Sequence, residues 1–333
     1  MYIDFHCDTL MWTAAKAVSA DLYDNKKTAV DFKRMKEAGQ IAQFFAVFMD
    51  TKEQMEKYDI LFPSDDAYFA GRIKNIKDNL KKYSDIVALA TNDQTLQHNI
   101  KNNKLSVFIT LEEGRMLNNA LDKLDNVYHE GVRLITLTWN YENSLGFPNS
   151  RDTETMNKGL KPFGKAVVEK MTELGMLVDV SHLSDGGFWD VADILKTPFI
   201  ASHSNCRSLD NHPRNLSDKM IREIADHGGV VGLNFSPDFL NQSQIQNQET
   251  KKIVLQSKID DMIRHLKHVL KTGGEDILAL GSDLDGISGA LEISNPLEFE
   301  KLFMRMKREG FTENQIEKLQ YKNAERIIKE VLK

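Results

Sequence analysis

The chain has few cysteines and few prolines, and each shortage excludes a class of protein. Two cysteines, Cys7 and Cys206, are too few for a framework of disulfide bonds. We therefore expect two reduced thiols, as in a cytoplasmic protein. With 7 prolines and 19 glycines among 333 residues, the sequence is neither collagen-like nor of low complexity.

Long hydrophobic runs and a basic excess are missing as well. No stretch approaches the roughly 18 consecutive apolar residues that cross a membrane. Residues 1–6 show no secretion signal, and residues 327–333 lack the apolar tail of a lipid anchor. The net charge is −6, whereas nucleic-acid binding requires a basic surface. We expect a cytoplasmic protein that binds a small molecule and neither nucleic acid nor a membrane.

Several common catalytic motifs do not occur in the sequence. It has neither a Gly-x-Gly-x-x-Gly loop nor a complete Walker pattern, so nucleotide cofactors are not indicated. The Gly-x-Ser-x-Gly motif is also missing, and nothing therefore signals an acyl-serine hydrolase.

What the sequence does contain is an alternation of short apolar runs with longer amphipathic segments. Eight runs lack strict polar alternation, which is typical of parallel strands covered on both faces. They are Tyr2–Phe5, Ile41–Phe48, Ser106–Leu111, Val132–Leu137, Met176–Val180, Pro198–Ala201, Val230–Phe235 and Ile277–Gly281. Eight such repeats predict an α/β fold, a (β/α)8 barrel of the TIM type, with residues 1–333 as a single domain. An open doubly wound sheet is the alternative, because residues 86–90 also resemble a strand.

Helical patterns fill the intervals between these runs. Apolar residues recur at helical spacing over residues 161–174 and 254–270, so both segments are predicted to be helices. Ser217 is expected to cap a helix that ends near residue 227. Thr312 and Gln315 have the spacing of a capping box at the start of the last helix.

Five of the eight runs deliver a histidine or a carboxylate at or just beyond their carboxyl ends. The residues are His6 and Asp8, Glu112 and Glu113, His182, His203, and Asp283 and Asp285. In a barrel these strand ends share one face, so the side chains should converge. Imidazole nitrogens and carboxylate oxygens suit zinc and similar divalent ions. Because the set exceeds what one tetrahedral ion needs, the pattern predicts two ions bridged by a shared carboxylate.

Other polar residues receive different interpretations. Arg214, in a turn-rich loop after His203, is a candidate for binding a substrate carboxylate. Cys7 should point away from its neighbours on an extended segment and is not counted as a ligand. The remaining histidines follow no strand and are expected at the surface; they are His98, His129, His212, His227, His265 and His268.

Taken together, these segments resemble the membrane (renal) dipeptidase family, the M19 metallopeptidases with amidohydrolase-like barrels. The matching segments span nearly the whole chain in the family's order. They are Asp4–Thr9, Leu111–Gly114, Leu134–Thr138, Val178–Ser184, Ile200–Ser204, Pro213–Asn215 and Gly281–Gly286.

The resemblance implies a zinc-dependent dipeptidase with two Zn²⁺ ions per chain, assembled as a homodimer. One ion would be bound by His6, Asp8 and Glu112, and the other by Glu112, His182 and His203. Glu112 rather than Glu113 matches the family's Glu-x-Gly pattern.

The resemblance also implies roles for two residues outside the ligand sets. Arg214 matches the arginine that binds the carboxylate of the dipeptide, and Asp283 matches the aspartate beside the bridging water. We therefore expect Asp283, together with Glu112, to act in catalysis, and Arg214 to bind the substrate.

The chain departs from the family at two positions. Family members have a histidine where Trp139 stands, thought to contact the transition state, and Asn140 is the candidate to replace it. Some members have a tyrosine where Ser236 stands. These differences leave two alternatives open: a binuclear barrel hydrolase of another small amide, lactone or phosphoester, and a catalytically inactive metal-binding barrel. If the protein is a dipeptidase, its substrates could include dipeptides with a D-residue.

Overall fold

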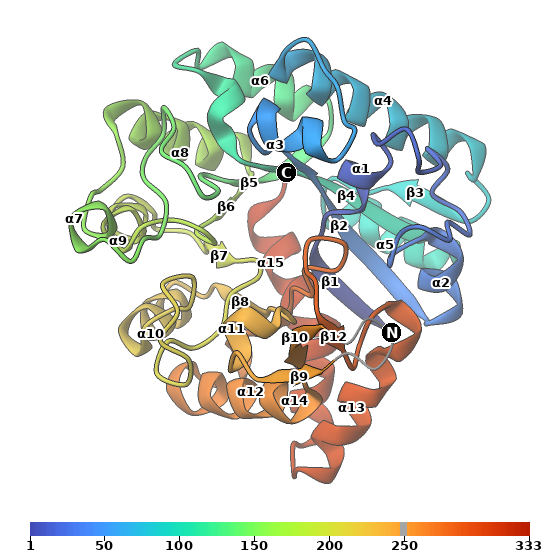
Figure 1. Cartoon of the computed structure of the whole chain (residues 1–333), viewed down its shortest axis with the longest axis vertical. Helices are drawn as coiled ribbons and strands as arrows, with labels where there is room; N and C mark the ends of the chain where they lie inside the picture. The colour runs from blue at the N-terminus through green and yellow to red at the C-terminus, as the bar shows by residue number, and fades with distance from the viewer. Residues whose placement is uncertain (247–251) are drawn as a thin grey trace.

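Eight parallel strands close into a barrel in the computed structural model, which describes residues 1–246 and 252–333 (Figure 1). The strands are β1 (Tyr2–Cys7), β2 (Gln40–Phe48), β4 (Leu105–Glu112), β5 (Val132–Thr136), β6 (Leu177–Asp179), β7 (Ile200–Ala201), β8 (Val230–Leu233) and β11 (Leu278–Leu280). They are neighbours in this order, and β11 pairs with β1 to complete the ring. The (β/α)8 barrel expected from the sequence is confirmed, and the alternative prediction of an open doubly wound sheet is wrong.

The additional strand-like run near residue 86 forms β3 (Val87–Leu89) outside this ring. β3 pairs with Leu105–Val107 at the start of β4, whereas β5 pairs with Ile109–Glu112 at its end. β3 therefore extends the sheet beside the first half of β4 without entering the barrel. It belongs to the long connection between the second and third barrel strands, β2 and β4.

Helices of very different lengths surround the strands. They are α1 (Thr9–Trp12), α2 (Phe32–Glu37), α3 (Lys52–Lys57), α4 (Asp65–Lys82), α5 (Asp93–Lys101), α6 (Asp122–His129), α7 (Thr153–Met156), α8 (Pro162–Leu174), α9 (Asp185–Ile194), α10 (Asp218–Asp226), α11 (Pro237–Leu240), α12 (Ile259–Gly273), α13 (Phe299–Arg308), α14 (Glu313–Glu317) and α15 (Asn323–Val331). The expected caps are present. The Ser217 side chain accepts a hydrogen bond from the backbone N–H of Met220, and Thr312 and Gln315 form a reciprocal capping box.

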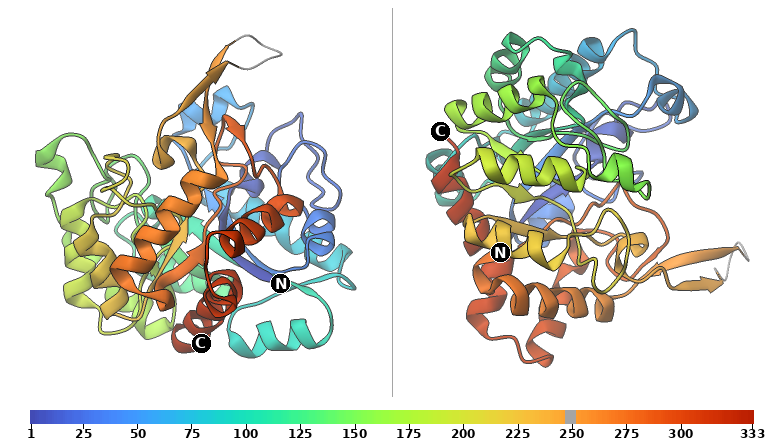
Figure 2. Two further views of the ribbon diagram at one scale, coloured as in Figure 1. Left: turned by 90° about the horizontal axis from the view of Figure 1, so that it is seen from below. Right: turned by 90° about the vertical axis from the view of Figure 1, so that its left-hand side faces the viewer.

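One predicted helix begins later than its sequence pattern indicated. Residues Ile253–Ser257 form β10, and α12 starts only at Ile259. β10 pairs with β9 (Gln244–Gln246) and with β12 (Ala290–Leu291), and β9 and β10 project from the body of the molecule (Figure 2). A short apolar run fits a strand as well as a helix. Here its pairing with two other strands makes the run a strand.

The interior of the barrel is filled by aromatic and aliphatic side chains. Phe44 packs on Phe5 and Phe108, with ring centroids 4.7 and 4.5 Å apart. Ile327 and Ile328 of α15 join the same core cluster together with residues from the starts of the strands. The barrel is therefore closed at its amino-terminal end, and its other end, at the carboxyl ends of the strands, is where active sites of this fold lie.

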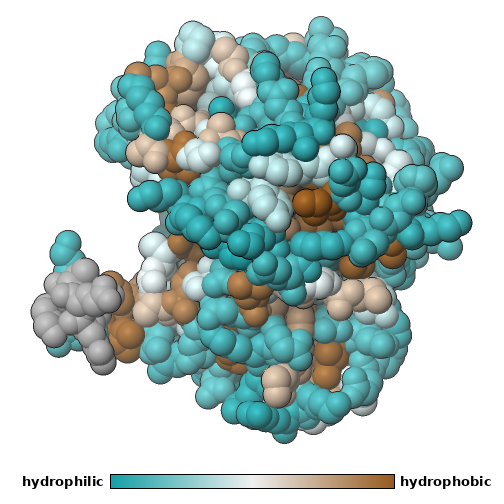
Figure 3. Space-filling model, turned by 90° about the vertical axis from the view of Figure 1, so that its right-hand side faces the viewer, coloured by the Kyte–Doolittle hydropathy of each residue, from teal (hydrophilic) through white to brown (hydrophobic). Residues whose placement is uncertain are grey.

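The face of the molecule in Figure 3 is mostly hydrophilic, with hydrophobic side chains in small separate patches. Among the described residues, no helix combines the length and the apolar character needed to cross a membrane.

His265 was expected at the surface and is instead wholly buried in α12. Its Nδ1 accepts a hydrogen bond from the backbone N–H of Cys206 at 3.1 Å, and its Nε2 donates to the carbonyl of Leu240 at 2.9 Å. This arrangement fits only the neutral ring, and burial lowers the pKa of His265 to about 4. The helical spacing from Met262 to Val269 already placed His265 on the apolar face of α12.

We expect the free energy of unfolding to fall as the pH drops from 6.5 toward 4. In this range the imidazole of His265 binds a proton in the unfolded chain but not in the folded one, which costs about 2 kcal/mol at pH 5. His265→Gln keeps an acceptor for Cys206 and a donor for Leu240 but does not titrate. Urea unfolding at pH 7 and pH 5 should show a smaller loss of stability in this variant than in the wild type. Equal losses would contradict the assignment.

Candidate metal centre

The carboxyl ends of five strands bring the predicted ligand residues together. β1 provides His6 and is followed directly by Asp8, and β4 ends with Glu112. His182, His203 and Asp283 lie in the first residues after β6, β7 and β11. All six side chains are buried. Residues nearly 280 positions apart thus meet at one face of the barrel.

Five of these residues form two overlapping donor sets. Each set offers one ligand atom per residue, all within 4.8 Å of one another: His6, Asp8 and Glu112 in one, and Glu112, His182 and His203 in the other. Glu112 Oε2 lies 3.2 Å from His6 Nε2. Glu112 Oε1 lies 3.2 Å from His182 Nε2 and 3.6 Å from His203 Nε2. The two carboxylate oxygens therefore serve different sets, as a bridging ligand requires.

The donor atoms lack the partners that buried polar groups normally have. Both ring nitrogens of His6 and Oδ1 of Asp8 are buried without a hydrogen bond. The Nε2 atoms of His182 and His203 lie only 3.0 Å apart. Unpaired buried polar atoms are rare, and a cation at the first set would give His6 Nε2 a partner. The residues fit two divalent cations.

Electrostatics favours the same conclusion. Burial lowers the pKa of His182 and His203 well below 6.5, so both rings are neutral and can offer a lone pair to a metal. Burial alone would also lower the pKa of His6, but Glu112 and Asp8 raise it well above 6.5. Burial, with the nearby charge of Glu112, raises the pKa of Asp8 to about 6. The first set thus carries a surplus of negative charge that a cation would neutralise.

A hydrogen-bonded chain orients the ring of His203. Its Nδ1 lies 2.7 Å from the hydroxyl of Ser202, and that hydroxyl donates to Asp179 Oδ2 at 2.6 Å. Asp179 also accepts from Thr136 Oγ1 and from the backbone N–H of Ser181. These hydrogen bonds turn Nε2 of His203 toward Glu112 and His182. Metal-bound histidines are oriented by similar hydrogen bonds to their second ring nitrogen.

His182 is held by the residue that was expected to contact the transition state. Asn140 Oδ1 lies 3.2 Å from His182 Nδ1 and can accept a hydrogen bond from an Nδ1–H, which leaves Nε2 for a metal. The neighbouring Trp139 packs edge-on against Phe48, with ring centroids 4.9 Å apart. His182 itself has φ +69°, a conformation that costs a non-glycine residue energy and often marks functional sites.

Glu113 points away from the donor sets. Its Oε1 accepts from the backbone N–H of Arg115 at 2.9 Å and from Asn143 Nδ2 at 2.5 Å, and its Oε2 accepts from the backbone N–H of Trp139 at 3.0 Å. Glu113 therefore organises the loops beside the site, and Glu112 alone of the pair faces the centre.

Asp283 and Arg214 lie beside the donor sets. Asp283 Oδ2 accepts from Asn234 Nδ2 at 2.8 Å, and Oδ1 lies 3.9 Å from His6 Nε2. Burial raises the pKa of Asp283 well above its usual range. Arg214 donates to the carbonyl of His203 and to Ser204 Oγ, both at 3.1 Å, while its buried Nε has no partner. Burial lowers the pKa of Arg214 only to about 10, so it stays cationic at neutral pH.

A cavity of about 610 Å³ opens over these residues. Its wall includes Asp8, Trp12, Phe48, Asp50, Tyr58, Glu112, Trp139, Asn140, His182, His212, Arg214, Ser236, Asp238, Phe239, Asp283, Asp285 and Gly286. His212, also expected at the surface, is half-buried in this wall beside Phe239, and burial lowers its pKa to about 4. The volume is that of an ordinary small-molecule site.

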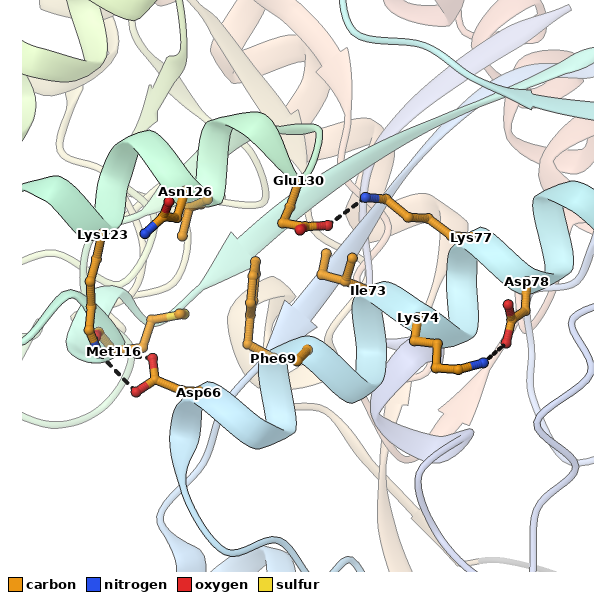
Figure 4. A pocket seen from close by; sticks show the side chains of 12 residues that line it. Asp66, Phe69, Ile73, Lys74, Lys77, Asp78, Met116, Lys123, Asn126 and Glu130 are labelled. Atoms are coloured by element: carbon orange, nitrogen blue, oxygen red, sulfur yellow. Dashed lines mark hydrogen bonds and ion pairs between the residues drawn. The ribbon is translucent and has the colours of Figure 1, made fainter.

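A second hollow of about 620 Å³ lies between α4 and α6 (Figure 4). Its apolar lining includes Phe69 and Ile73 of α4, and the pairs Lys123–Asp66 and Lys77–Glu130 also line it. It contains none of the predicted site residues.

No role was predicted for Gly286, which shapes the cavity wall. A Cβ atom there would overlap Asp8 Oδ2 and Asp283 Oδ1. We expect Gly286→Ala to displace these carboxylates and to weaken metal binding about 10- to 100-fold. Gly71→Ala on α4 is the control, because a Cβ at Gly71 meets nothing within 4 Å. Titration of metal-free protein with zinc measures the effect, and equal affinities in both variants would contradict it.

Comparison with known proteins agrees with the fold. The model of the family "Membrane dipeptidase (Peptidase family M19)" matches residues 1–333. An uncharacterized dipeptidase of Schizosaccharomyces pombe is 29% identical over 92% of this chain and 73% of its own length. Two crystal structures share the fold at 23% identity. The dipeptidase AC, a metallopeptidase of family M19, has a TM-score of 0.82 over 99% of this chain and 98% of its own.

The second structure is a Rhodobacter sphaeroides metallopeptidase bound to a phosphinate mimic of the dipeptide L-Ala-D-Ala. It has a TM-score of 0.80 and covers 99% of both chains. Because the family model spans every residue of the chain, the protein belongs to the membrane dipeptidase family, peptidase family M19, and is a metallo-dipeptidase.

Proposed function

We propose that the protein is a zinc-dependent enzyme that hydrolyses the peptide bond of small dipeptides, including dipeptides with a D-residue. Residues 1–333 would form one hydrolase domain with two Zn²⁺ ions per chain. The observation that carries the proposal is the position of Glu112 between two donor sets, in one cavity with the cationic Arg214. The L-Ala-D-Ala mimic in the Rhodobacter sphaeroides structure supports the extension to D-residues.

In this proposal each donor set holds one ion. His6, Asp8 and Glu112 would bind the first, and Glu112, His182 and His203 the second. Two bound divalent ions would lower the pKa of water from 15.7 toward about 7, which makes the water a better nucleophile. They would also polarise the carbonyl group of the substrate, which makes it a better electrophile.

Asp283 would move the proton during hydrolysis. Its carboxylate lies beside His6, and Asn234 holds its second oxygen in place. A carboxyl group with a raised pKa can take a proton from the attacking water and give it to the leaving amine. Asn140 would contact the developing oxyanion through its amide nitrogen, while its oxygen stays on His182.

Arg214 would bind the carboxylate at the C-terminus of the substrate, which restricts the enzyme to dipeptides. We expect Arg214→Met, which keeps an apolar stem near Phe239, to lower kcat/KM for L-Ala-L-Ala about 10- to 100-fold. L-Ala-L-Ala amide lacks the carboxylate and should lose much less. Steady-state kinetics on both substrates checks this. Equal losses would show that Arg214 does not bind the carboxylate.

The function itself is tested with a substrate panel. Chelator-treated protein is supplied with zinc and assayed with L-Ala-L-Ala, L-Ala-D-Ala, a small lactone and a phosphotriester. We expect cleavage of the dipeptides that stops with chelator and returns with zinc. Cleavage of only the lactone or the phosphotriester would support the other binuclear hydrolase, for which Trp139 at the histidine position of the family is the favouring feature.

We also propose a homodimer in the cytoplasm. The dimer rests on the family resemblance, and light scattering of the purified protein tests it. The location is supported by Cys7 and Cys206, which are both free and buried as expected of a reducing compartment.

A further inference from the structure

One buried carboxylate in the cavity wall has no part in the proposed chemistry. Two of the lining acids belong to the donor sets, and Asp283 faces them. Asp285 accepts hydrogen bonds from Thr9 and from the backbone before α2, and Asp238 is exposed on α11. Asp50 remains. It lies two residues beyond β2 and is only 6% exposed.

Asp50 has few partners within the protein. Its Oδ1 accepts a hydrogen bond from the backbone N–H of Thr51 at 2.6 Å, and no described lysine or arginine comes within 4.0 Å of its carboxylate. Arg115 donates to the backbone carbonyl of Asp50, but its guanidinium pairs with Asp65 at 3.0 and 3.2 Å. Burial raises the pKa of Asp50 more than Thr51, Arg115 and Lys57 lower it. The carboxylate is buried with unused capacity for a cation.

Asp50 lies on the side of the barrel toward which the N-terminal residue of a bound dipeptide would extend. Three strands separate β2 from β7 in either direction around the barrel, so the two strands face each other across it (Figure 1). Arg214 follows β7, and Asp50 follows β2. Phe48, at the end of β2, is level with Glu112 on β4. A dipeptide with its carboxylate on Arg214 and its peptide bond at the donor sets therefore extends its N-terminal residue toward β2.

The cavity that Asp50 lines has aromatic side chains in its wall. Phe48 packs against Trp139, and Trp12 packs against Tyr58, with ring centroids 4.9 and 5.4 Å apart. Such a wall suits an aliphatic stem, and a carboxylate beyond it suits a cationic end group. We propose that Asp50 selects dipeptides whose N-terminal residue is lysine or arginine. This inference rests on the proposed dipeptidase function and names a substrate class for it.

The test compares two substrates that differ only in the charged group. L-Lys-L-Ala and L-norleucyl-L-Ala have stems of equal length, and only the first ends in an ammonium. We expect the zinc-loaded wild type to show a kcat/KM about tenfold or more higher for L-Lys-L-Ala. Asp50→Asn keeps the acceptor for Thr51 but removes the charge, and should reduce this ratio to about one. Asp78→Asn, on the surface of α4 outside the cavity, is the control and should keep the ratio.

The possible outcomes distinguish a failure of the role of Asp50 from a failure of the proposed dipeptidase function. If neither dipeptide is cleaved, the proposed function fails. If both are cleaved equally well by the wild type, dipeptide hydrolysis stands and the role of Asp50 is wrong. If Asp50→Asn slows both substrates to the same extent, Asp50 acts on the α-amino group or on the fold, and the inference is overturned.

Discussion

Replacing Glu112 by glutamine should reduce bound metal from two ions per chain to at most one and lower kcat/KM by more than about 100-fold. The reason lies in the two oxygens of Glu112, which face different donor sets. A glutamine has a single oxygen, so its amide nitrogen would turn toward either His6 or His182. A neutral amide also provides less charge for two cations. Metal analysis of the purified variant and dipeptide kinetics check this result.

Glu113→Gln is the matched control, because the two residues are adjacent and equally buried. Glu113 accepts three hydrogen bonds from loops and none from the donor sets. The variant should keep both ions but unfold more easily, since an amide N–H would face one of these donors at a cost of about 1–3 kcal/mol. If Glu113→Gln loses the metal and Glu112→Gln retains it, Glu112 is not the bridging ligand.

Asp283→Asn should lower kcat about 10²- to 10⁴-fold while the metal content stays at two. Asparagine keeps an oxygen for the hydrogen bond from Asn234, so the side chain should hold its position. It cannot accept a proton from water at any pH near neutral. Kinetics at saturating dipeptide, together with metal analysis of the same sample, checks the prediction.

Two other outcomes would assign Asp283 differently. Near-normal turnover would remove its role in proton transfer. Loss of metal would make it a ligand instead, which its geometry allows, because one ligand atom each from His6, His203 and Asp283 also lies within 4.8 Å of the others.

The barrel was predictable because its strands are buried on both faces. Each of the eight apolar runs became a barrel strand, and the polar residues at their ends had only one face on which to meet. That geometry predicted that these side chains converge, whereas the division into two donor sets was implied by the family resemblance. The sequence could not show the direction of individual side chains, such as the turn of Glu113 toward Arg115 and Asn143.

Interactions between distant segments explain what the sequence did not reveal. The pairing of β10 with β9 and β12 overrode the helical spacing predicted from residue 254 onward. The partners of His265 come from Cys206 and Leu240, far along the chain. Asp50 follows a strand end like the ligands do, but the sequence could not show that the guanidinium of Arg115 pairs with Asp65 and not with the carboxylate of Asp50.

Metal stoichiometry is the most direct test of the binuclear centre. Metal-free protein is titrated with zinc, bound ions are counted per chain, and hydrolysis of L-Ala-L-Ala is followed in the same samples. We expect saturation at two ions per chain and activity that chelator abolishes and zinc restores. Saturation at a single ion, or no binding at all, would contradict a site built from two donor sets that share Glu112.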